Sequence, residues 1–197
     1  MRIQTDAIGL GALLLIFGSW LVFALLFLLR KRTEKTEVVR RAPAARLGIT
    51  LQAIAYALVW TFRRSRWWPF PASMAAEAAV AAVAVGVVWA SDWLCLRAIQ
   101  TLGKQWTVQA RLVKGHELIT TGPYAFVRNP IYLSMFGLLL GTGLAVSQPW
   151  ALLAAMVVYL LGNYIRIHAE ENLLRESFGA QFDEYTRRVP AFLPRIF

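Results

Sequence analysis

The chain is organised around residues 115–134, GHELITTGPYAFVRNPIYLS, where a polar, turn-rich segment runs straight into an apolar one. Gly122-Pro123 predicts a tight turn. Asn129-Pro130 predicts a helix start, with Asn129 as the N-cap and Pro130 at the first helical position, where a missing N–H costs nothing. The positive end of that helix would face the polar segment and favour an anionic group such as a carboxylate. We interpret the segment as a candidate site; a well-capped entry into a membrane helix is the alternative.

On the C-terminal side of this segment, residues 131–165 are apolar and too long for one membrane span. Ser147-Gln148-Pro149 interrupts the run, which predicts a helical hairpin. From Arg166 the chain is polar again and is expected to continue as a helix that ends at Phe178-Gly179. We expect an amphipathic helix from 180 to about 188 and then an extended, apolar tail that folds back on the protein or the bilayer.

On the N-terminal side, three further apolar runs cover residues 7–29, 47–62 and 72–96. The first holds 23 residues, enough to cross a hydrocarbon core of roughly 30 Å. A hydrophobic content of 58% and a mean hydropathy of +0.51 exclude an ordinary soluble domain. The sequence therefore predicts an all-α integral membrane protein with about five transmembrane helices. We expect one domain over 1–197, with three spans in 1–97 and a core in 98–197 that contains the hairpin over 130–165.

The charge distribution predicts how the chain is oriented. The net charge of +10 arises from 21 Lys and Arg against 11 Asp and Glu. In a membrane protein such an excess indicates which loops are cytoplasmic and which contact membrane lipids, and it does not indicate nucleic-acid binding. Residues 30–46 carry seven basic and two acidic side chains, and residues 97–128 carry five and one. The N-terminus is thus expected outside, with the candidate segment and the C-terminus cytoplasmic. Cys95 is the only cysteine, which excludes an intrachain disulfide and a cysteine-based metal cluster; we predict no metal site.

Arg166 and Glu170 are four residues apart where the last span is expected to leave the membrane, so they share one helix face. An intrahelical ion pair of this order contributes only about 0.2–0.5 kcal/mol. We therefore favour ligand contacts, with Arg166 as a fork for a carboxylate and Glu170 as an acceptor for an ammonium group.

The run from His116 to Tyr132, followed by Glu170-Glu171, Phe178-Gly179, Tyr185, and Arg188-Val-Pro190 with Leu193-Pro194, resembles the isoprenylcysteine carboxyl methyltransferase family. These integral membrane enzymes are similar in turn to phospholipid N-methyltransferases. The resemblance covers about the last 90 residues. The family's Arg-His-Pro-x-Tyr-x-Gly pattern stands here as Arg128-Asn-Pro-Ile-Tyr-Leu-Ser134. Asn129 cannot titrate near neutrality, which argues against an acid–base role, and Ser134 narrows the approach of a ligand or helix.

The resemblance implies a site for S-adenosyl-L-methionine, released after transfer as S-adenosyl-L-homocysteine. Arg166 would hold the substrate carboxylate as the catalytic residue, with Arg128 as a second substrate-binding residue. Tyr124 and Tyr132 would offer ring faces to the sulfonium, and Glu170 would hold the amino group. The cofactor-binding residues implied are Gln109, His116, Glu117, Leu118, Ile119, Tyr124, Asn129, Pro130, Ile131, Tyr132 and Glu170.

A lipophilic carboxylate that enters from the bilayer is the substrate we favour. Because a carboxylate is ionised at neutral pH, its methylation requires alignment and exclusion of water but no general base. An amine would first lose a proton, and Glu171 or His168 would be the candidate base. Three alternatives stay open: a phospholipid N-methyltransferase acting on an ethanolamine headgroup, an NADPH-dependent membrane reductase, and a non-catalytic membrane scaffold.

Overall fold

The computed structural model describes residues 7–28, 38–41, 45–63, 74–103, 111–113 and 117–192. Gln109 and His116 lie outside these ranges. The elements in chain order are α1 (Ala7–Leu28), β1 (Val38–Arg41), α2 (Ala45–Thr61), α3 (Met74–Leu102), β2 (Arg111–Val113), the 3₁₀ helix η2 (Gly122–Ala125), α4 (Pro130–Val146), α5 (Pro149–Phe178) and α6 (Ala180–Arg188).

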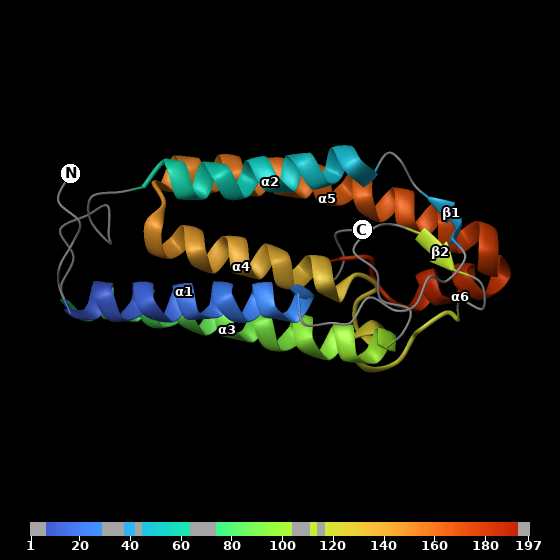
Figure 1. Ribbon diagram of the computed structural model, residues 1–197, viewed down its shortest axis with the longest axis horizontal. Coiled ribbons are helices and arrows are strands. Elements are labelled where there is room, and N and C mark those ends of the chain that lie inside the picture. Colours follow the sequence, from blue (N-terminus) through green and yellow to red (C-terminus); the bar gives the residue numbers. More distant parts are fainter. Residues whose placement is uncertain are drawn as a thin grey trace.

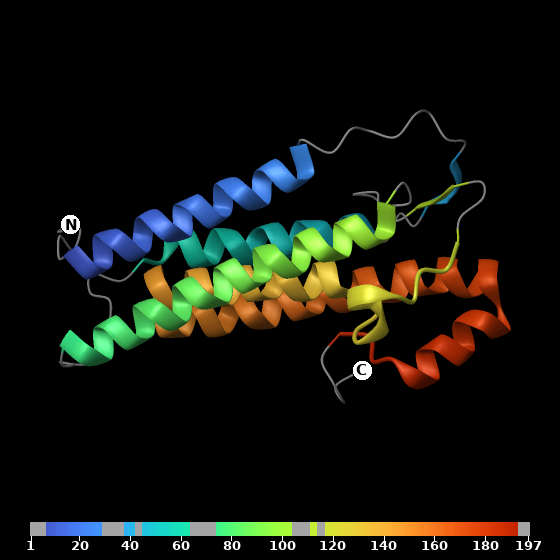
Figure 2. The same cartoon turned by 90° about the horizontal axis from the view of Figure 1, so that it is seen from below.

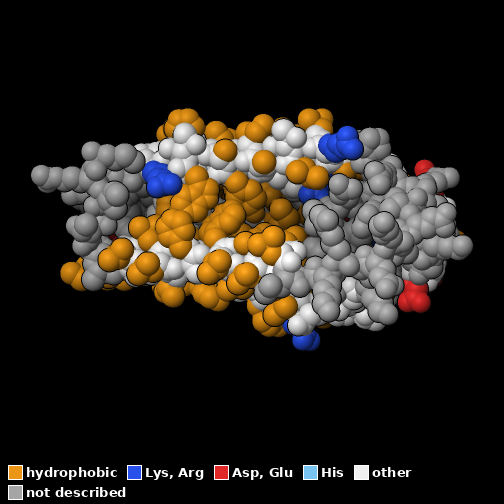
Figure 3. Space-filling model, viewed as in Figure 1, with side chains coloured by type: hydrophobic (Ala, Val, Ile, Leu, Met, Phe, Trp, Pro, Cys, Tyr) orange, Lys and Arg blue, Asp and Glu red, His pale blue; other side chains and the backbone are white. Residues whose placement is uncertain are grey.

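Within the described residues, each of the five predicted spans contains a helix. The protein is an integral membrane protein. Three of the helices, α1, α3 and α5, are long and apolar enough to cross a membrane. Helices α2 and α4 have 17 residues each, and their crossing of the bilayer stays a prediction. Hydrophobic side chains cover the middle of the molecule, while the charged side chains seen in this view lie towards its two ends (Figure 3).

The helices form a bundle in which α2 packs along α5, and α3 packs along α4 and α1 (Figures 1 and 2). Two glycines of α4 allow its close packing against α3. A Cβ atom on Gly137 would collide with the Ser91 hydroxyl, and one on Gly141 would lie 2.8 Å from the backbone oxygen of Ala84. The buried Asp92 carboxylate accepts a hydrogen bond of 2.6 Å from Ser19, which joins α1 to α3.

Local breaks follow the sequence prediction closely. The hairpin turns at Ser147 and Gln148, and Pro149 begins α5. Gly179, with a φ of 50°, ends α5 in the left-handed conformation that favours glycine. Helix α6 therefore turns back beside the end of α5 (Figure 2).

Two features differ from the prediction. Helix α3 continues to Leu102 and not to 96, because polar residues after the membrane segment extend the same helix. The strands β1 and β2, which were not predicted, pair antiparallel. They lie with α6 at one end of the molecule, opposite the end at which α1 begins (Figure 1).

Candidate functional site

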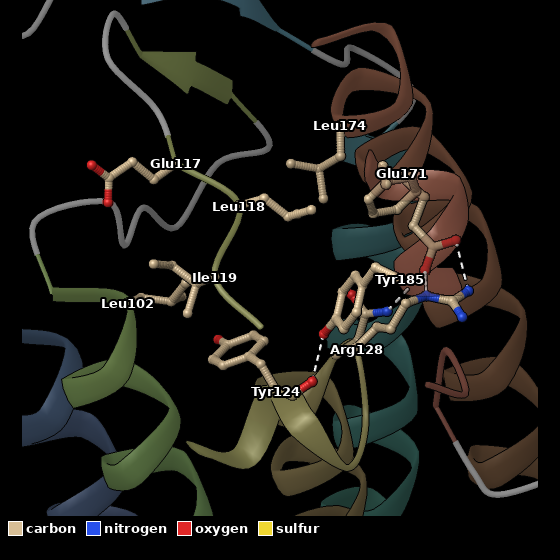
Figure 4. Close-up of a pocket in the computed structure, with 11 residues that line it drawn as sticks. Leu102, Glu117, Leu118, Ile119, Tyr124, Arg128, Glu171, Leu174 and Tyr185 are labelled. Atoms are coloured by element: carbon tan, nitrogen blue, oxygen red, sulfur yellow. Dashed lines mark hydrogen bonds and ion pairs between the residues drawn. The ribbon is translucent and has the colours of Figure 1, made fainter. Parts of the chain in front are cut away.

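A cavity lies at the end of the bundle that carries α6, between the segment before α4 and the last two helices. The space between its side chains measures about 430 Å³, including the part open to solvent. Figure 4 shows Leu118 and Ile119 on one side of it and Glu171 and Tyr185 on the other. The lining residues are Leu102, Glu117, Leu118, Ile119, Tyr124, Arg128, Asn129, Glu171, Leu174, Phe182 and Tyr185.

The floor of the cavity is fixed by the predicted turn. Gly122 has a φ of 59° and opens η2, as the Gly-Pro pair indicated. Tyr124 in η2 is buried, and its backbone oxygen accepts a hydrogen bond of 2.6 Å from the hydroxyl of Tyr185 in α6 (Figure 4). Burial raises the pKa of Tyr185 to about 12; the Arg128 guanidinium opposes this shift and the Glu171 carboxylate adds to it. The hydroxyl therefore stays a donor at neutral pH.

Arg128 and Glu171 form a charged contact with two hydrogen bonds in the cavity wall. Arg128 Nε lies 2.8 Å from Glu171 Oε1, and its NH2 lies 3.0 Å from Oε2. The same guanidinium donates to the backbone oxygens of Val189 and Thr186. Fork-to-fork contacts of this kind fix geometry as well as charge. The hydrogen bonds of Arg128 thus connect the segment before α4 with α5 and with the end of α6.

Asn129 is the N-cap residue of α4, as predicted, but its side chain is bonded elsewhere. Helix α4 does begin at Pro130, but the Asn129 side chain makes no capping hydrogen bond. Its amide donates instead to Ala191 O at 2.8 Å and to Glu171 Oε1 at 3.4 Å. Ala191 O also accepts a hydrogen bond of 3.1 Å from the Asn129 backbone N–H. Both the backbone and the side chain of Asn129 are therefore bonded to the tail after α6. Asn129 at the N-cap and Pro130 at the helix start are as predicted, but the side-chain hydrogen bond usual for such a cap is absent.

A second cluster lies inside the bundle, around Arg166. The Arg166 side chain is buried, its guanidinium lies 4.6 Å from the ring centroid of Tyr132, and its NH2 lies 3.6 Å from Glu170. The Tyr132 hydroxyl donates to Glu170. From α2, Gln52 accepts a hydrogen bond of 3.0 Å from Arg166 NH1. The intrahelical ion pair between Arg166 and Glu170 is therefore present. The cation over the Tyr132 ring, where a sulfonium was expected, is the Arg166 guanidinium.

The predicted site residues thus divide between two neighbouring places. Six of them line the cavity: Glu117, Leu118, Ile119, Tyr124, Arg128 and Asn129. Three of them, Tyr132, Arg166 and Glu170, form the buried cluster, while Pro130 and Ile131 begin α4. The adjacent pair Glu170-Glu171 connects the two places, because Glu171 lines the cavity and Glu170 faces the cluster.

Sequence reasoning missed several of these residues. Leu102, Leu174 and Phe182 complete the cavity, and only their periodic positions on helices hint at burial. Gln52 was read as part of an apolar run. Its partner Arg166 is 114 positions away, so no local pattern could have joined them.

The family assignment rests on a match to the part of the chain that contains most residues of the cavity and of the Arg166 cluster. A family model described as phospholipid methyltransferase matches residues 79–181. The chain belongs to the phospholipid methyltransferase family. The resemblance to the isoprenylcysteine carboxyl methyltransferases is confirmed by the relatives and by a solved structure. The match begins within α3, so the relationship extends beyond the last 90 or so residues.

The relatives carry two kinds of name. The chain is 37% identical over 100 residues to a nickel-cobalt-cadmium resistance protein of Alcaligenes xylosoxydans xylosoxydans, covering 49% of this chain and 45% of the relative. It is 34% identical over 101 residues to protein-S-isoprenylcysteine O-methyltransferase B of Arabidopsis thaliana, covering 50% and 51%. This phospholipid methyltransferase family member therefore spans about half the length of these two relatives. A probable protein-S-isoprenylcysteine O-methyltransferase of Oryza sativa subsp. indica is 26% identical over 94% of both chains.

A solved structure shares the fold. The eukaryotic intramembrane Ras methyltransferase known as isoprenylcysteine carboxyl methyltransferase superposes with a TM-score of 0.59 at 22% identity. The superposition covers 93% of this chain and 63% of that one. The shared arrangement thus includes the N-terminal helices, for which the sequence indicated only a general membrane character.

Proposed function

We propose that the protein is an S-adenosyl-L-methionine-dependent methyltransferase that esterifies the carboxylate of a lipophilic substrate, such as an isoprenylcysteine. The observation that carries this proposal is the juxtaposition of an open cavity with a buried arginine. Five residues of the implied cofactor site and the implied substrate residue Arg128 line the cavity, and the Arg166 cluster lies directly beside it on α5. The relatives named as protein-S-isoprenylcysteine O-methyltransferases support the reaction class.

The residues of the cavity fit the cofactor. Its rings Tyr124, Phe182 and Tyr185 suit an adenine or a sulfonium. The carboxylate of Glu117 adds a negative charge to the lining that would attract a sulfonium cation, while the charge of Glu171 is paired with Arg128. When bound, the cofactor supplies a methyl group on positively charged sulfur.

We assign the amino group of the cofactor to Glu170, beside Glu171. Gln109 and His116, implied by the family resemblance, remain proposed contacts outside the described residues. Arg128 remains a proposed substrate contact, although its guanidinium already holds Glu171.

The protein's own contribution would be orientation and exclusion of water. Arg166 offers five N–H donors in a rigid plane, held in place by Gln52 and Tyr132. A substrate carboxylate bound there has one oxygen fixed and the other left to attack the methyl carbon. No proton transfer is needed, so the reaction requires proximity and a dry site and no base. The lipid portion would stay among the apolar helices while the cofactor enters from the cytoplasm.

The same geometry disfavours an amine acceptor. Glu171, a candidate base, is held by Arg128 through two hydrogen bonds. His168, the other candidate, is exposed and lies 3.2 Å from the backbone oxygen of Tyr164. Neither residue is placed to take a proton from an ethanolamine headgroup. Phospholipid N-methylation is therefore the second candidate, favoured only by the description of the matching family model.

Calorimetric titration of the detergent-purified protein with S-adenosyl-L-homocysteine tests the cofactor site. We expect micromolar binding by the wild type and by Leu153→Trp, whose side chain is 63% exposed on α5. Binding should be lost in Leu118→Trp, which fills the cavity, and in Glu170→Ala. A folded wild type that binds nothing would overturn the proposal and make NADPH the next ligand to titrate.

Assays with two acceptors then separate the candidate reactions. We expect methyl transfer to N-acetyl-S-farnesylcysteine and none to phosphatidylethanolamine. Arg166→Ala should keep its affinity for S-adenosyl-L-homocysteine and lose turnover, because the carboxylate loses its holder. Normal turnover in this variant would remove Arg166 from the site.

A further inference from the structure

Gln52 is the least expected residue beside Arg166. It lies on α2, is only 2% exposed, and accepts a hydrogen bond of 3.0 Å from Arg166 NH1 through its Oε1. It also lies outside residues 79–181, the part of the chain that the family model matches. Its role therefore has to be inferred from its contacts.

The chemistry of the contact fixes which way the Gln52 amide points. A guanidinium has donors and no acceptor, so the amide oxygen must face Arg166. The amide nitrogen, which carries two N–H donors, is not bonded to the guanidinium. That nitrogen is buried and has no hydrogen-bond partner within the part of the chain that the structure describes. A buried donor without a partner is destabilising, and a ligand oxygen would remove that cost.

The packing of α2 against α5 keeps Gln52 at this place. Gly48, one turn before Gln52, lies against Gly162, one turn before Arg166: a Cβ atom on Gly162 would lie 2.8 Å from the Gly48 oxygen and 3.3 Å from the backbone nitrogen of Gln52. The two backbones are thus in close contact. The Gln52 side chain has little freedom to turn away from the guanidinium.

The charge at position 52 also matters. Arg166 already has one carboxylate close by, and an amide at position 52 orients the guanidinium without adding a second carboxylate to it. Glu170 is 3.6 Å from Arg166 NH2, and its Oε1 also accepts from Tyr132. The cluster therefore pairs a positioned cation with an adjacent buried donor, which suits a carboxylate of a ligand.

We propose that Gln52 and Arg166 together form the site for the acceptor carboxylate, with Gln52 Nε2 donating to the oxygen that does not react. This inference rests on the proposed function and deepens it. In this site the Gln52 side-chain oxygen positions the Arg166 guanidinium, and the side-chain nitrogen contacts the substrate carboxylate. Helix α2 then contributes directly to acceptor recognition.

Two substitutions at position 52 test the inference. Gln52→Met keeps the length of the side chain but removes both polar atoms, and Gln52→Glu keeps a partner for Arg166 but neutralises it and removes the donor. We expect both variants to bind S-adenosyl-L-homocysteine with wild-type affinity. The KM for N-acetyl-S-farnesylcysteine should rise at least tenfold in both, and more in Gln52→Glu. The matched controls are Gln148→Met and Gln148→Glu, at the opposite end of α5, which should keep the wild-type KM.

The outcomes separate this inference from the proposed function. A wild-type protein that methylates the acceptor while both Gln52 variants keep its KM would overturn the inference alone. A role limited to stabilising the fold would lower the melting temperature and the affinity for S-adenosyl-L-homocysteine together with turnover, and would overturn it too. If Gln52→Met does not fold, the KM of Gln52→Glu decides. A wild type with no methyl transfer would overturn the proposed function itself.

Discussion

Arg128 and Glu171 are joined by two hydrogen bonds, from Nε to Oε1 at 2.8 Å and from NH2 to Oε2 at 3.0 Å. Their side chains are only 10% and 13% exposed. The contact connects the segment before α4 with the far part of α5 in one wall of the cavity. We therefore expect it to determine both the stability of this end of the molecule and the shape of the site.

Arg128→Ala is expected to lower the free energy of unfolding by about 3 kcal/mol, because a nearly buried carboxylate loses its partner. Affinity for S-adenosyl-L-homocysteine should fall with it. Arg188→Ala is the control: its ion pair with Glu184 is 70% and 63% exposed, so its loss should change stability by less than about 0.5 kcal/mol. Thermal unfolding in detergent measures both variants. Equal stability of the two would contradict a structural role for the Arg128–Glu171 contact.

Tyr185→Phe tests the hydrogen bond that holds η2 against α6. At pH 8 the variant should lose about 1 kcal/mol of stability, the usual contribution of one hydrogen bond. Burial raises the pKa of Tyr185 to about 12, above the ordinary tyrosine value of about 10. The protonated hydroxyl therefore contributes fully below about pH 10, and its contribution is lost as the pH rises towards 12.

The difference between wild type and Tyr185→Phe should consequently shrink when unfolding is measured at pH 11 and above. Lys and Arg side chains titrate alike in both proteins, so the comparison isolates this hydroxyl. A difference that stays constant from pH 8 to pH 11.5 would show that the hydroxyl is not the group concerned.

Phe192→Ala tests how the tail after α6 is held. Phe192 is fully buried and packs edge-to-face against Phe136 in α4, with 5.8 Å between ring centroids. Its truncation should cost about 3–5 kcal/mol, as for other buried aromatic side chains. Phe126→Ala serves as the control because Phe126 is 80% exposed. A destabilisation of the same small size in both variants would mean that the tail contributes little to the fold.

The elements that sequence could predict are those with local signals. Pro130 and Pro149 begin the two helices of the hairpin, and Gly179 ends α5, because proline and glycine act on their own backbone. Hydropathy marked where the apolar segments lie but not where the helices end. Helix α3 extends to Leu102 because a polar sequence can continue a helix once it has left the apolar segment.

The parts of the candidate site that sequence could not predict depend on distant partners. Asn129 is a good N-cap residue by type, yet its amide is bonded to Ala191, 62 positions away. The family resemblance indicated the cofactor segment but gave no means of dividing its residues between the cavity and the Arg166 cluster. That division follows from how α4 and α5 pack, which is tertiary information.

Topology can be tested with the single native cysteine removed. Cys95 is fully buried, so Cys95→Ala provides a background for labelling introduced cysteines. Met74 begins α3 and is 74% exposed, while Glu184 lies on α6 with a side chain 63% exposed. With the N-terminus outside, Met74→Cys should react with an impermeant maleimide on intact cells and Glu184→Cys only after permeabilisation. The reverse pattern would place the cavity outside.

Gly48→Ala tests whether the close approach of α2 and α5 is what positions Arg166. A Cβ atom at this position would lie 2.5 Å from the backbone oxygen of Gly162 and would collide with the Arg166 side chain. The helices must separate or the arginine must move, so we expect a loss of about 1–3 kcal/mol of stability. Methyl transfer should fall more than S-adenosyl-L-homocysteine affinity does, because the cavity lies farther along the bundle.

Gly86→Ala in α3 is the control: its Cβ would meet nothing within 4 Å, and alanine should match or improve stability by up to about 1 kcal/mol. Unchanged turnover in Gly48→Ala, measured beside this control, would show that Arg166 does not depend on the α2–α5 contact and would separate the packing of the bundle from its chemistry.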